Sequence, residues 1–501
     1  MRLAWNIAAA MANSVVLVLI NLIALPFYLR FLGMEAYGLI GFYTTLQAVL
    51  QVLDLGLAPT VSREIAHGAE TEQQRRSASL LRTLGLIYAG VAVAIATIVV
   101  LIAPWIGAHW LQAKALPESV VAQAVMLMGV NLACRWPISL YQGALIGAHR
   151  LARAAATSMT VNICAAITTI AVLAWGMRSI RAFFVVQAGF GLLQVIVLRV
   201  LAHNAVGERD APYDFGDLRR VWHFSAWMSG IATTSLVFTQ LDKVLLSRLI
   251  DLGSFGHYML AVLLVSGLSV LTVPTFNVIF PKFTTLHARG DIASLATFYS
   301  DTSRIFAVAV FALALALALH VEAIVTLWTA RPDVALQVAP LVALLVVGSA
   351  LNAVMNFPYA LQLAFGRPRI PFAINISLLV LALPTIVWLA RHYGAIGGAL
   401  SWALLGNVYL FVGTIVTGRR VASFAGIGWL ARDILVPLAI VLMPALLGLW
   451  VTRDAILPPW AETMVAMLAA CVGVAVGASY SPFARRQVLI FLRRYMRLCP
   501  N

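Results

Sequence analysis

Residues 239–258 read TQLDKVLLSRLIDLGSFGHY, and the interpretation of the fold depends on this stretch. Its first half continues an apolar run from near residue 221, and such a run is long enough to cross a membrane, which takes about 20 residues. Asp242 and Lys243 interrupt the run with two adjacent, opposite charges. Because charges are costly in hydrocarbon, this part of the span predicts either a functional site or an internal ion pair.

The whole chain has the composition of a multi-pass membrane protein. Of its 501 residues, 62% are hydrophobic and 11% are charged, whereas soluble globular domains carry about 25% charged residues. Apolar runs of about 17 to 25 residues predict an all-α polytopic protein with about fourteen transmembrane helices. The expected spans are 6–29, 36–60, 83–106, 120–146, 155–175, 181–202, 221–247, 256–280, 303–328, 336–363, 371–391, 395–416, 433–451 and 461–480. A turn at 392–398 separates the eleventh span from the twelfth.

Basic residues predict the orientation of these spans. If both termini lie on one side, 24 of the 34 Lys and Arg residues fall on that side, 8 on the other and 2 within spans. Since basic residues gather in cytoplasmic loops, both termini are expected in the cytoplasm. The net charge of +15 then reflects topology and contact with anionic lipids, and no long basic face predicts nucleic-acid binding. Residues 485–497 are expected to form a short amphipathic helix on the inner leaflet.

An internal repeat appears when the chain is shifted by 218 to 220 residues. RFLGMEAYG (Arg30–Gly38) then superposes on RLIDLGSFG (Arg248–Gly256), and His67 falls against His287. The GAHR motif after the fourth span likewise meets the GRPR motif after the tenth. Because each copy holds an even number of spans, the two copies are expected to be parallel repeats around an axis along the membrane normal.

The repeat predicts the domain organisation and a cavity. Two lobes that open alternately to either side, with a binding cavity between them, are typical of such repeats. The expected parts are an N-terminal six-helix lobe at 1–203, a cytoplasmic connector at 204–220, a C-terminal six-helix lobe at 221–418, an additional helix pair at 433–480 and a basic cytoplasmic tail at 481–501.

Four stretches carry a family resemblance: RFLGMEAYGLIGFYTTLQAVLQVLDLGLAPTVSREIA (Arg30–Ala66), QLDKVLLSRLIDLGSFGHYMLA (Gln240–Ala261), IFPKFTTLHARGD (Ile279–Asp291) and HYGAIGGALSW (His392–Trp402). They resemble the Wzx-type oligosaccharide flippase family, a branch of the multidrug/oligosaccharidyl-lipid/polysaccharide exporter superfamily. The likeness runs from the first span through the twelfth. It implies a transporter of the bacterial inner membrane that flips an undecaprenyl-pyrophosphate-linked oligosaccharide from the cytoplasmic to the periplasmic leaflet, for O-antigen, capsule or exopolysaccharide assembly.

The resemblance leaves alternatives open. Many members have twelve spans, and the extra pair here resembles fourteen-span lipid II flippases, so a lipid II-type substrate is one alternative. A cation-coupled multidrug exporter is another. A membrane-embedded glycosyltransferase or polymerase would need a large periplasmic loop or an outer acidic pair, and the sequence shows neither. Besides membrane lipids, a polysaccharide polymerase and a chain-length regulator are the partners that the resemblance suggests.

Enzyme signatures are missing from the sequence. It contains no GxxxxGK[ST] phosphate-binding loop, no HExxH motif and no Cys/His cluster, so we expect no catalysis, no cofactor and no metal site.

A substrate with a pyrophosphate group needs a cationic, hydrogen-bonding cavity. Arg135 and Lys243 are the basic residues expected within spans, and Arg30 and Arg248 lie at span ends. Pro137 follows Arg135 closely and can kink its helix, which would free backbone carbonyls toward a cavity. We therefore expect these four residues to bind the substrate.

Each intramembrane charge also has a structural alternative. Arg135 could pair with Asp54, which could instead couple transport to protons or anchor a loop. Lys243 could reach for the periplasmic surface and be neutralised by Asp242. The repeat favours function for this last pair, because its positions correspond to apolar Ala24 and Leu25 in the first copy. A fifth charge, Glu322, is expected at the periplasmic interface.

Neutral polar residues within the spans mark possible lumen faces. Gln47 and Gln51 share one helix face, and so do Asn352 and Asn356, because residues four apart are neighbours on a helix. Asn131, in the fourth span, is the fifth candidate. Hydrogen bonding between spans is the alternative explanation for all five.

Overall fold

The computed structural model describes residues 2–54, 57–70, 74–207, 212–213, 234, 236–453 and 457–480. These residues form helices, and within them no strand occurs beyond one isolated bridge between Gln112 and Asp251. Ten helical segments of this part of the chain are long and apolar enough to cross a membrane. The all-α polytopic class is therefore confirmed, while the number of fourteen spans stays a prediction.

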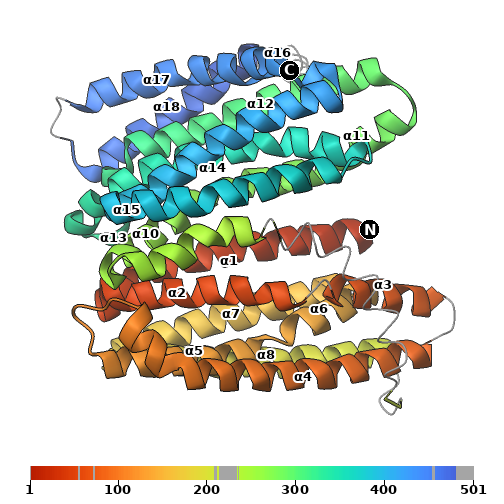
Figure 1. Cartoon of the computed structure of the whole chain (residues 1–501), viewed down its shortest axis with the longest axis vertical. Helices are drawn as coiled ribbons and strands as arrows, with labels where there is room; N and C mark the ends of the chain where they lie inside the picture. Colours follow the sequence, from red (N-terminus) through yellow and green to blue (C-terminus); the bar gives the residue numbers. More distant parts are fainter. Residues whose placement is uncertain are drawn as a thin grey trace, which may run out of the picture. The chain divides into compact units, whose positions relative to one another are not determined.

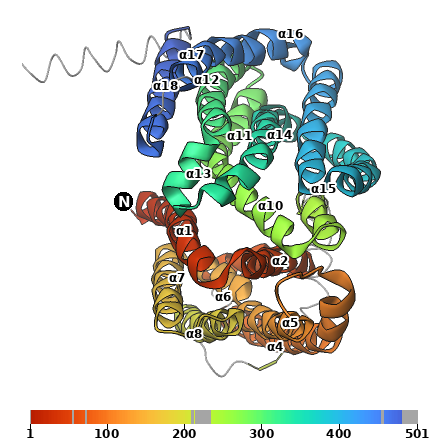
Figure 2. The same ribbon diagram turned by 90° about the vertical axis from the view of Figure 1, so that its left-hand side faces the viewer.

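The chain divides into two compact units, Met1–Gly256 and His257–Asn501. Within each unit the long helices run roughly parallel or antiparallel to one another (Figure 1), and Figure 2 shows many of them end-on. The lobe boundaries expected from the repeat, at 203 and 221, remain a prediction. Residues 214–233, which include the start of the expected seventh span, and the tail at 481–501 lie outside the described residues.

The first unit is built from eight named helices and a further helical stretch at 236–249. Its core lies where α3, α6 and α8 pack beside α4, around the buried side chains of Val61, Leu84 and Leu145. The helices are α1 (Arg2–Leu32), α2 (Met34–Leu50), α3 (Leu57–Glu70), α4 (Gln74–Trp105), α5 (Glu118–Arg135), α6 (Ile138–Gly147), α7 (Leu151–Ala174) and α8 (Ile180–Val206).

The expected span 36–60 is divided in the structure. Helix α2 ends at Leu50 and a 3-10 turn follows over Gln51–Asp54. Helix α3 then begins at Leu57, with Pro59 in its first turn, where the missing N–H of proline leaves no helix bond unmade. Its buried residues Leu57, Val61 and Ile65 are spaced by four, which makes α3 amphipathic.

The second unit holds α11, α12 and the helices that follow, and α10 begins in the first unit and continues into the second. The turn predicted at 392–398 is confirmed, because Gly394 has φ 58° and ψ −134° inside an otherwise helical segment. The helices are α10 (Leu252–Val265), α11 (Ser269–Ala288), α12 (Ile292–Leu319), α13 (Val321–Thr329), α14 (Pro332–Ala364), α15 (Arg369–Arg420), α16 (Ile427–Trp429), α17 (Val436–Arg453) and α18 (Pro459–Tyr480). Glu322 lies in the first turn of α13.

The additional helix pair, α17 and α18, packs on α12. Asp433, just before α17, is fully buried and accepts hydrogen bonds from Arg304 Nε on α12 at 2.7 Å and from Ser300 Oγ at 2.5 Å. Directly after α12, His320 Nδ1 lies 3.4 Å from Glu462 Oε1 of α18. Ionisable contacts therefore attach the pair at two places, one within α12 and one at its C-terminal end.

Candidate functional site

Arg135 lies in the first unit, at the end of α5, where the helix is interrupted. Helix α5 ends at Arg135 and α6 begins at Ile138, so Trp136 and Pro137 form the break that the sequence predicts. Pro137 has no N–H for the carbonyl four residues earlier, which is why the ladder of hydrogen bonds stops here. The break places the guanidinium among α5, α6 and α8, inside the unit.

Helix α8 provides the surroundings of the guanidinium. Arg135 Nη2 donates a hydrogen bond to Gln187 Oε1 at 2.9 Å. One turn further, a Cβ on Gly191 would lie 2.8 Å from Arg135 Cγ, so only glycine leaves room for the arginine stem. Arg135 Nε is buried and has no hydrogen-bond partner among the described residues. Gln187 and Gly191 therefore hold the arginine side chain in place, while its Nε–H donor has no acceptor among the described residues.

Polar side chains continue from Arg135 through the interior of the unit. Gln187 Nε2 donates to Thr169 Oγ1 at 3.4 Å, and Ser158 Oγ accepts from Gln142 Nε2 at 2.9 Å and from Gln194 Nε2 at 3.2 Å. Gln187, Gly191 and Gln194 share one face of α8 because their spacing is four and three residues. We call Asn131, Arg135, Thr169 and Gln187 the Arg135 cluster.

Asn131 belongs to this cluster and lies one helical turn before Arg135 on α5. It is completely buried, and its Oδ1 accepts a hydrogen bond from Tyr43 Oη of α2 at 3.2 Å. Its Nδ2 has no partner in the described structure. Two buried donors, on Asn131 and Arg135, thus remain without an acceptor, which is unusual because buried polar groups are nearly always hydrogen-bonded.

Asp54 does not pair with Arg135. Its Oδ1 accepts hydrogen bonds from Tyr88 Oη and, at 3.1 Å, from Ser139 Oγ of α6. No carboxylate of the described residues forms an ion pair with Arg135. The alternative of a structural Arg135–Asp54 pair is therefore not realised, and within the described residues Arg135 donates to the amide oxygen of Gln187 and to no carboxylate.

Lys243 and Asp242 do contact each other. Lys243 Nζ lies 3.1 Å from Asp242 Oδ1 and donates to the carbonyl oxygen of Thr239 at 2.6 Å. The side chain of Asp242 is 4% exposed and that of Lys243 is 13% exposed. The ammonium therefore folds back along its own helix toward Thr239, away from the helix end at Arg248. Asp242 neutralises it as the structural alternative expects, but the ammonium does not reach toward the expected periplasmic end.

Arg248 and Arg30 are exposed at helix ends. Arg248 Nη1 donates to the carbonyl oxygen of His109 at 2.6 Å, and its guanidinium carbon lies 5.3 Å from the ring centre of Trp110. Arg30 lies in the last turn of α1. Arg248 thus braces the loop after α4, and neither residue belongs to the Arg135 cluster.

The same loop is held by several further bonds within the first unit. The carbonyl oxygen of Gln112 accepts from the N–H of Leu252 at 2.9 Å, and Lys114 Nζ lies 3.6 Å from Asp251 Oδ2. Burial raises the pKa of Asp251, but hydrogen bonds from Ser254 and the charge of Lys114 outweigh it and lower the pKa overall. These contacts therefore hold the recurring part of the opening stretch, RLIDLGSFG, against this loop.

The remaining polar candidates do not gather around one site. Gln47 is half-buried on α2 and Gln51 is exposed in the 3-10 turn. In the second unit, Asn356 Nδ2 donates to backbone carbonyls of its own helix, those of Asn352 at 3.2 Å and Ala353 at 3.1 Å. Of the five neutral candidates, the structure brings only Asn131 into the Arg135 cluster.

Sequence reasoning missed the partner of Arg135. Gln187, which binds Arg135, interrupts an apolar run just as Arg135 does, and Gln194 repeats the interruption seven residues later on the same face. Two glutamines seven residues apart in an apolar run indicate a polar face on the helix, and this was the signal that could have pointed to Gln187. Asp433 was also missed, although it begins an expected span. Within the described ranges, no group of three or more His, Cys, Asp or Glu residues could hold a metal ion.

Known structures define the class of this fold. The lipid II flippase MurJ in an inward closed conformation has a TM-score of 0.70 at 14% identity, and the alignment covers 95% of this chain and 99% of that one. An inward-facing multidrug resistance transporter of the MATE family has a TM-score of 0.62 at 14% identity, covering 81% and 94%. The chain therefore has the multi-pass helical fold of these two membrane transporters.

The sequence identifies the family within this class. The profile of the polysaccharide biosynthesis protein family matches residues 3–287, which is more than half of the chain. A Shigella flexneri protein named "Putative O-antigen transporter" is 20% identical over 399 residues, covering 77% of this chain and 91% of the relative. The chain belongs to the polysaccharide biosynthesis protein family, which confirms the resemblance seen in the sequence.

Proposed function

We propose that the protein flips an undecaprenyl-pyrophosphate-linked oligosaccharide from the cytoplasmic to the periplasmic leaflet of a bacterial inner membrane. The flipped glycan would serve O-antigen, capsule or exopolysaccharide assembly, with a polymerase and a chain-length regulator as downstream partners. Membership of the polysaccharide biosynthesis family and the likeness to a Shigella flexneri O-antigen transporter support this substrate class. The excess of basic residues on one side supports cytoplasmic termini.

Arg135 is the observation that carries the proposal. It is a membrane-depth guanidinium without a paired carboxylate among the described residues, and one of its donors is unused. A pyrophosphate is a strong acceptor for such a group, because charge-assisted hydrogen bonds between guanidinium and phosphate are short and strong. Gln187 would hold the guanidinium in place and the other polar side chains of the cluster would receive sugar hydroxyls.

The proposed mechanism is alternating access of a cationic cavity. The head group would enter from the cytoplasmic side and leave to the periplasmic side, while the lipid tail stays in the bilayer. Arg30 and Arg248 remain proposed contributors to the positive potential along this path, and Lys243, which Asp242 neutralises, remains a proposed substrate-binding residue. Asp54, which holds Tyr88 and Ser139 beside the helix break, is a proposed coupling residue.

A deletion strain tests the proposal. Without the protein, lipid-linked oligosaccharide should accumulate in the cytoplasmic leaflet and surface polysaccharide should disappear. Plasmid-borne wild type should restore both. Normal surface polysaccharide in the deletion strain, together with sensitivity to cationic dyes, would instead show a multidrug exporter and overturn the proposal.

A lipid II-type flippase is the second candidate. The structural alignment with MurJ covers 95% of this chain, whereas the MATE alignment covers 81%. Under this alternative, depletion would cause accumulation of lipid II and cell lysis with surface polysaccharide still exported. Quantifying both lipid-linked species in the same depleted cells separates the two candidates.

A further inference from the structure

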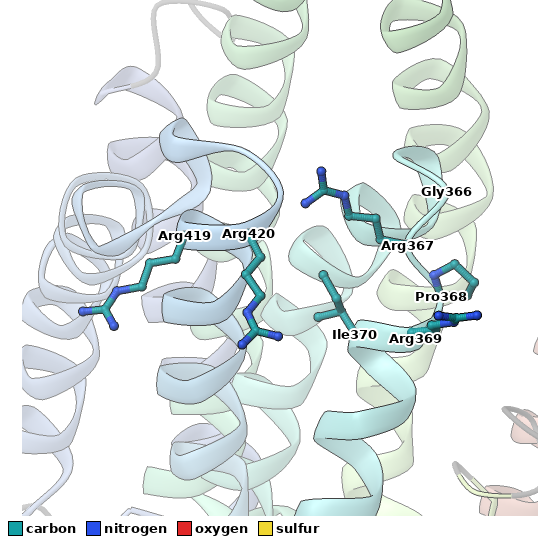
Figure 3. A pocket seen from close by; sticks show the side chains of 7 residues that line it. All are labelled: Gly366, Arg367, Pro368, Arg369, Ile370, Arg419 and Arg420. Carbon is teal, nitrogen blue, oxygen red and sulfur yellow. The ribbon is translucent and has the colours of Figure 1, made fainter.

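A hollow of about 790 Å³ lies in the second unit, where α14 ends and α15 begins and ends. It is lined by the turn 366–370 and by Arg419 and Arg420. Figure 3 shows Arg367 and Arg420 reaching from its two walls toward the space between them, with Arg369 and Arg419 on the outer sides. We call this hollow the arginine pocket.

One wall of the pocket is a tightly defined turn. Helix α14 ends in a Schellman motif, in which the N–H of Gly366 donates to Leu363 O and the N–H of Arg367 to Gln362 O, both at 3.0 Å. Gly366 has φ +66°, a conformation that glycine adopts without strain. Pro368 then precedes the first turn of α15 with φ −64°. The backbone carrying Arg367 and Arg369 is therefore fixed.

A buried hydrogen bond ties the two walls together. Gln362 Nε2 donates to Thr417 Oγ1 at 2.7 Å, and the two residues are 1% and 0% exposed. Gln362 belongs to the turn motif, and Thr417 lies one turn before Arg420. The spacing of Arg367 and Arg420 across the pocket is thus set by the fold and does not depend on the flexible arginine stems alone.

Among the described residues, the four arginines have no acidic neighbour to neutralise them. No Asp or Glu occurs in the sequence between Asp333 and Asp433. Asp433 is fully buried and engaged by Arg304 and Arg432. In the described part of the chain, none of the four pocket arginines forms an ion pair. Basic residues at the end of a helix commonly complement its dipole, which suits Arg419 and Arg420, but Arg367 and Arg369 lie at the beginning of α15, where the dipole is positive.

We propose that the arginine pocket binds the phosphate-bearing head group of an anionic phospholipid. Planar guanidinium groups on opposing walls match the oxygens of a phosphate, and Ile370 gives the pocket an apolar side for the glycerol backbone. The orientation proposed above places these arginines at the cytoplasmic leaflet, where anionic lipids attract basic residues. A lipid bound there would brace the ends of α14 and α15.

Lipid titration of the purified full-length protein tests this assignment. Delipidated protein is titrated with phosphatidylglycerol or phosphatidylcholine, and bound lipid is counted by native mass spectrometry. The variant Arg367→Gln/Arg420→Gln should bind phosphatidylglycerol about 25-fold more weakly, since each basic residue near an anionic head group contributes about fivefold. The control Lys282→Gln/Arg289→Gln removes two exposed charges of the same unit outside the pocket and should stay within about twofold of wild type.

The further variants and competitors give results that either support or overturn the proposal. Arg367→Lys/Arg420→Lys keeps the charge without the planar fork, so an intermediate loss supports phosphate recognition. Equal loss in the control, unchanged binding in the pocket variant or equal retention of phosphatidylcholine would overturn the assignment. Inorganic pyrophosphate is added as a competitor, and complete displacement of lipid at micromolar concentration would show a soluble-anion site instead. Unchanged melting temperatures confirm that both glutamine variants are folded.

Discussion

Gly38 and Gly256 each lie against a backbone carbonyl of the other's segment, within the first unit. A Cβ on Gly38 would lie 2.3 Å from Leu252 O, and one on Gly256 would lie 2.6 Å from Met34 O. Both pairs, Gly38 with Gly256 and Met34 with Leu252, are 218 residues apart in the chain. The contact is therefore reciprocal, as a two-fold relation between the two copies of the RFLGMEAYG motif requires. Small residues permit such close approach of helices in membranes.

We predict that Gly38→Ala and Gly256→Ala each destabilise the protein by about 1 to 3 kcal/mol, the usual effect of overpacking. The added methyl group would meet a backbone oxygen, which cannot move away as a side chain would. The measurement is the temperature of half-unfolding in detergent. Gly90→Ala and Gly189→Ala are matched controls, because both glycines are helical with nothing within 4 Å of the new Cβ. Equal stability of all four variants would contradict the reciprocal contact.

Arg135→Ala should reduce polysaccharide export by about 10- to 100-fold, which corresponds to the loss of one charge-assisted hydrogen bond. Gln187→Ala should reduce export less, since it frees the guanidinium without removing its charge. Surface polysaccharide is quantified in the deletion strain at equal membrane levels of protein. Arg181→Ala removes an exposed arginine from the first turn of α8 and serves as the control. Wild-type export by the Arg135 variant would refute a role in substrate binding.

Lys243→Ala should abolish export and also lower the melting temperature, because it removes the ammonium next to the buried carboxylate of Asp242. The double variant Asp242→Asn/Lys243→Gln removes both charges and should regain the stability but not the export. Melting temperature and surface polysaccharide are measured on the same preparations. Full export by the double variant would show that Asp242 and Lys243 only neutralise each other and have no role in transport.

Asp433→Asn should destabilise the second unit by about 3 to 5 kcal/mol, since it breaks a buried ion pair by removing one partner. The helix pair α17 and α18 should then become sensitive to protease before the rest of the protein. Asp333→Asn is the control, because its ion pair with Arg331 is exposed and such pairs contribute about 0 to 1 kcal/mol. Equal protease resistance of the two variants would contradict the role of Asp433 in attaching α17 and α18 to α12.

Hydropathy predicted most of the helices because it is averaged over about 20 residues of each span. A single polar or charged residue therefore changes the average little. The turn at 392–398 was predicted from its glycines, and Gly394 supplies the non-helical conformation there. The separation of α3 from α2 was not predicted, since Leu57, Val61 and Ile65 extend the apolar run even though they belong to an amphipathic helix. Average hydropathy does not distinguish a helix that ends from one that continues.

Single residues of the site were predicted better than their partners. A charge within an apolar run is conspicuous in a sequence, so Arg135 and Lys243 were found. Whether Arg135 contacts Asp54 or Gln187 depends on the rotation of α5 and α8 about their axes, and a sequence position does not determine that rotation. The proximity of Gln187, 52 residues along the chain, therefore required the structure.

Reconstituted flipping measures the central claim most directly. Purified protein is placed in liposomes that contain a fluorescently labelled, undecaprenyl-pyrophosphate-linked oligosaccharide, and dithionite is added outside to quench the accessible label. Wild type should make the inner-leaflet label accessible, whereas Arg135→Ala should do so about 10- to 100-fold more slowly. Protection of the inner-leaflet label in the presence of wild type, or flipping by Arg135→Ala at the wild-type rate, would contradict the account.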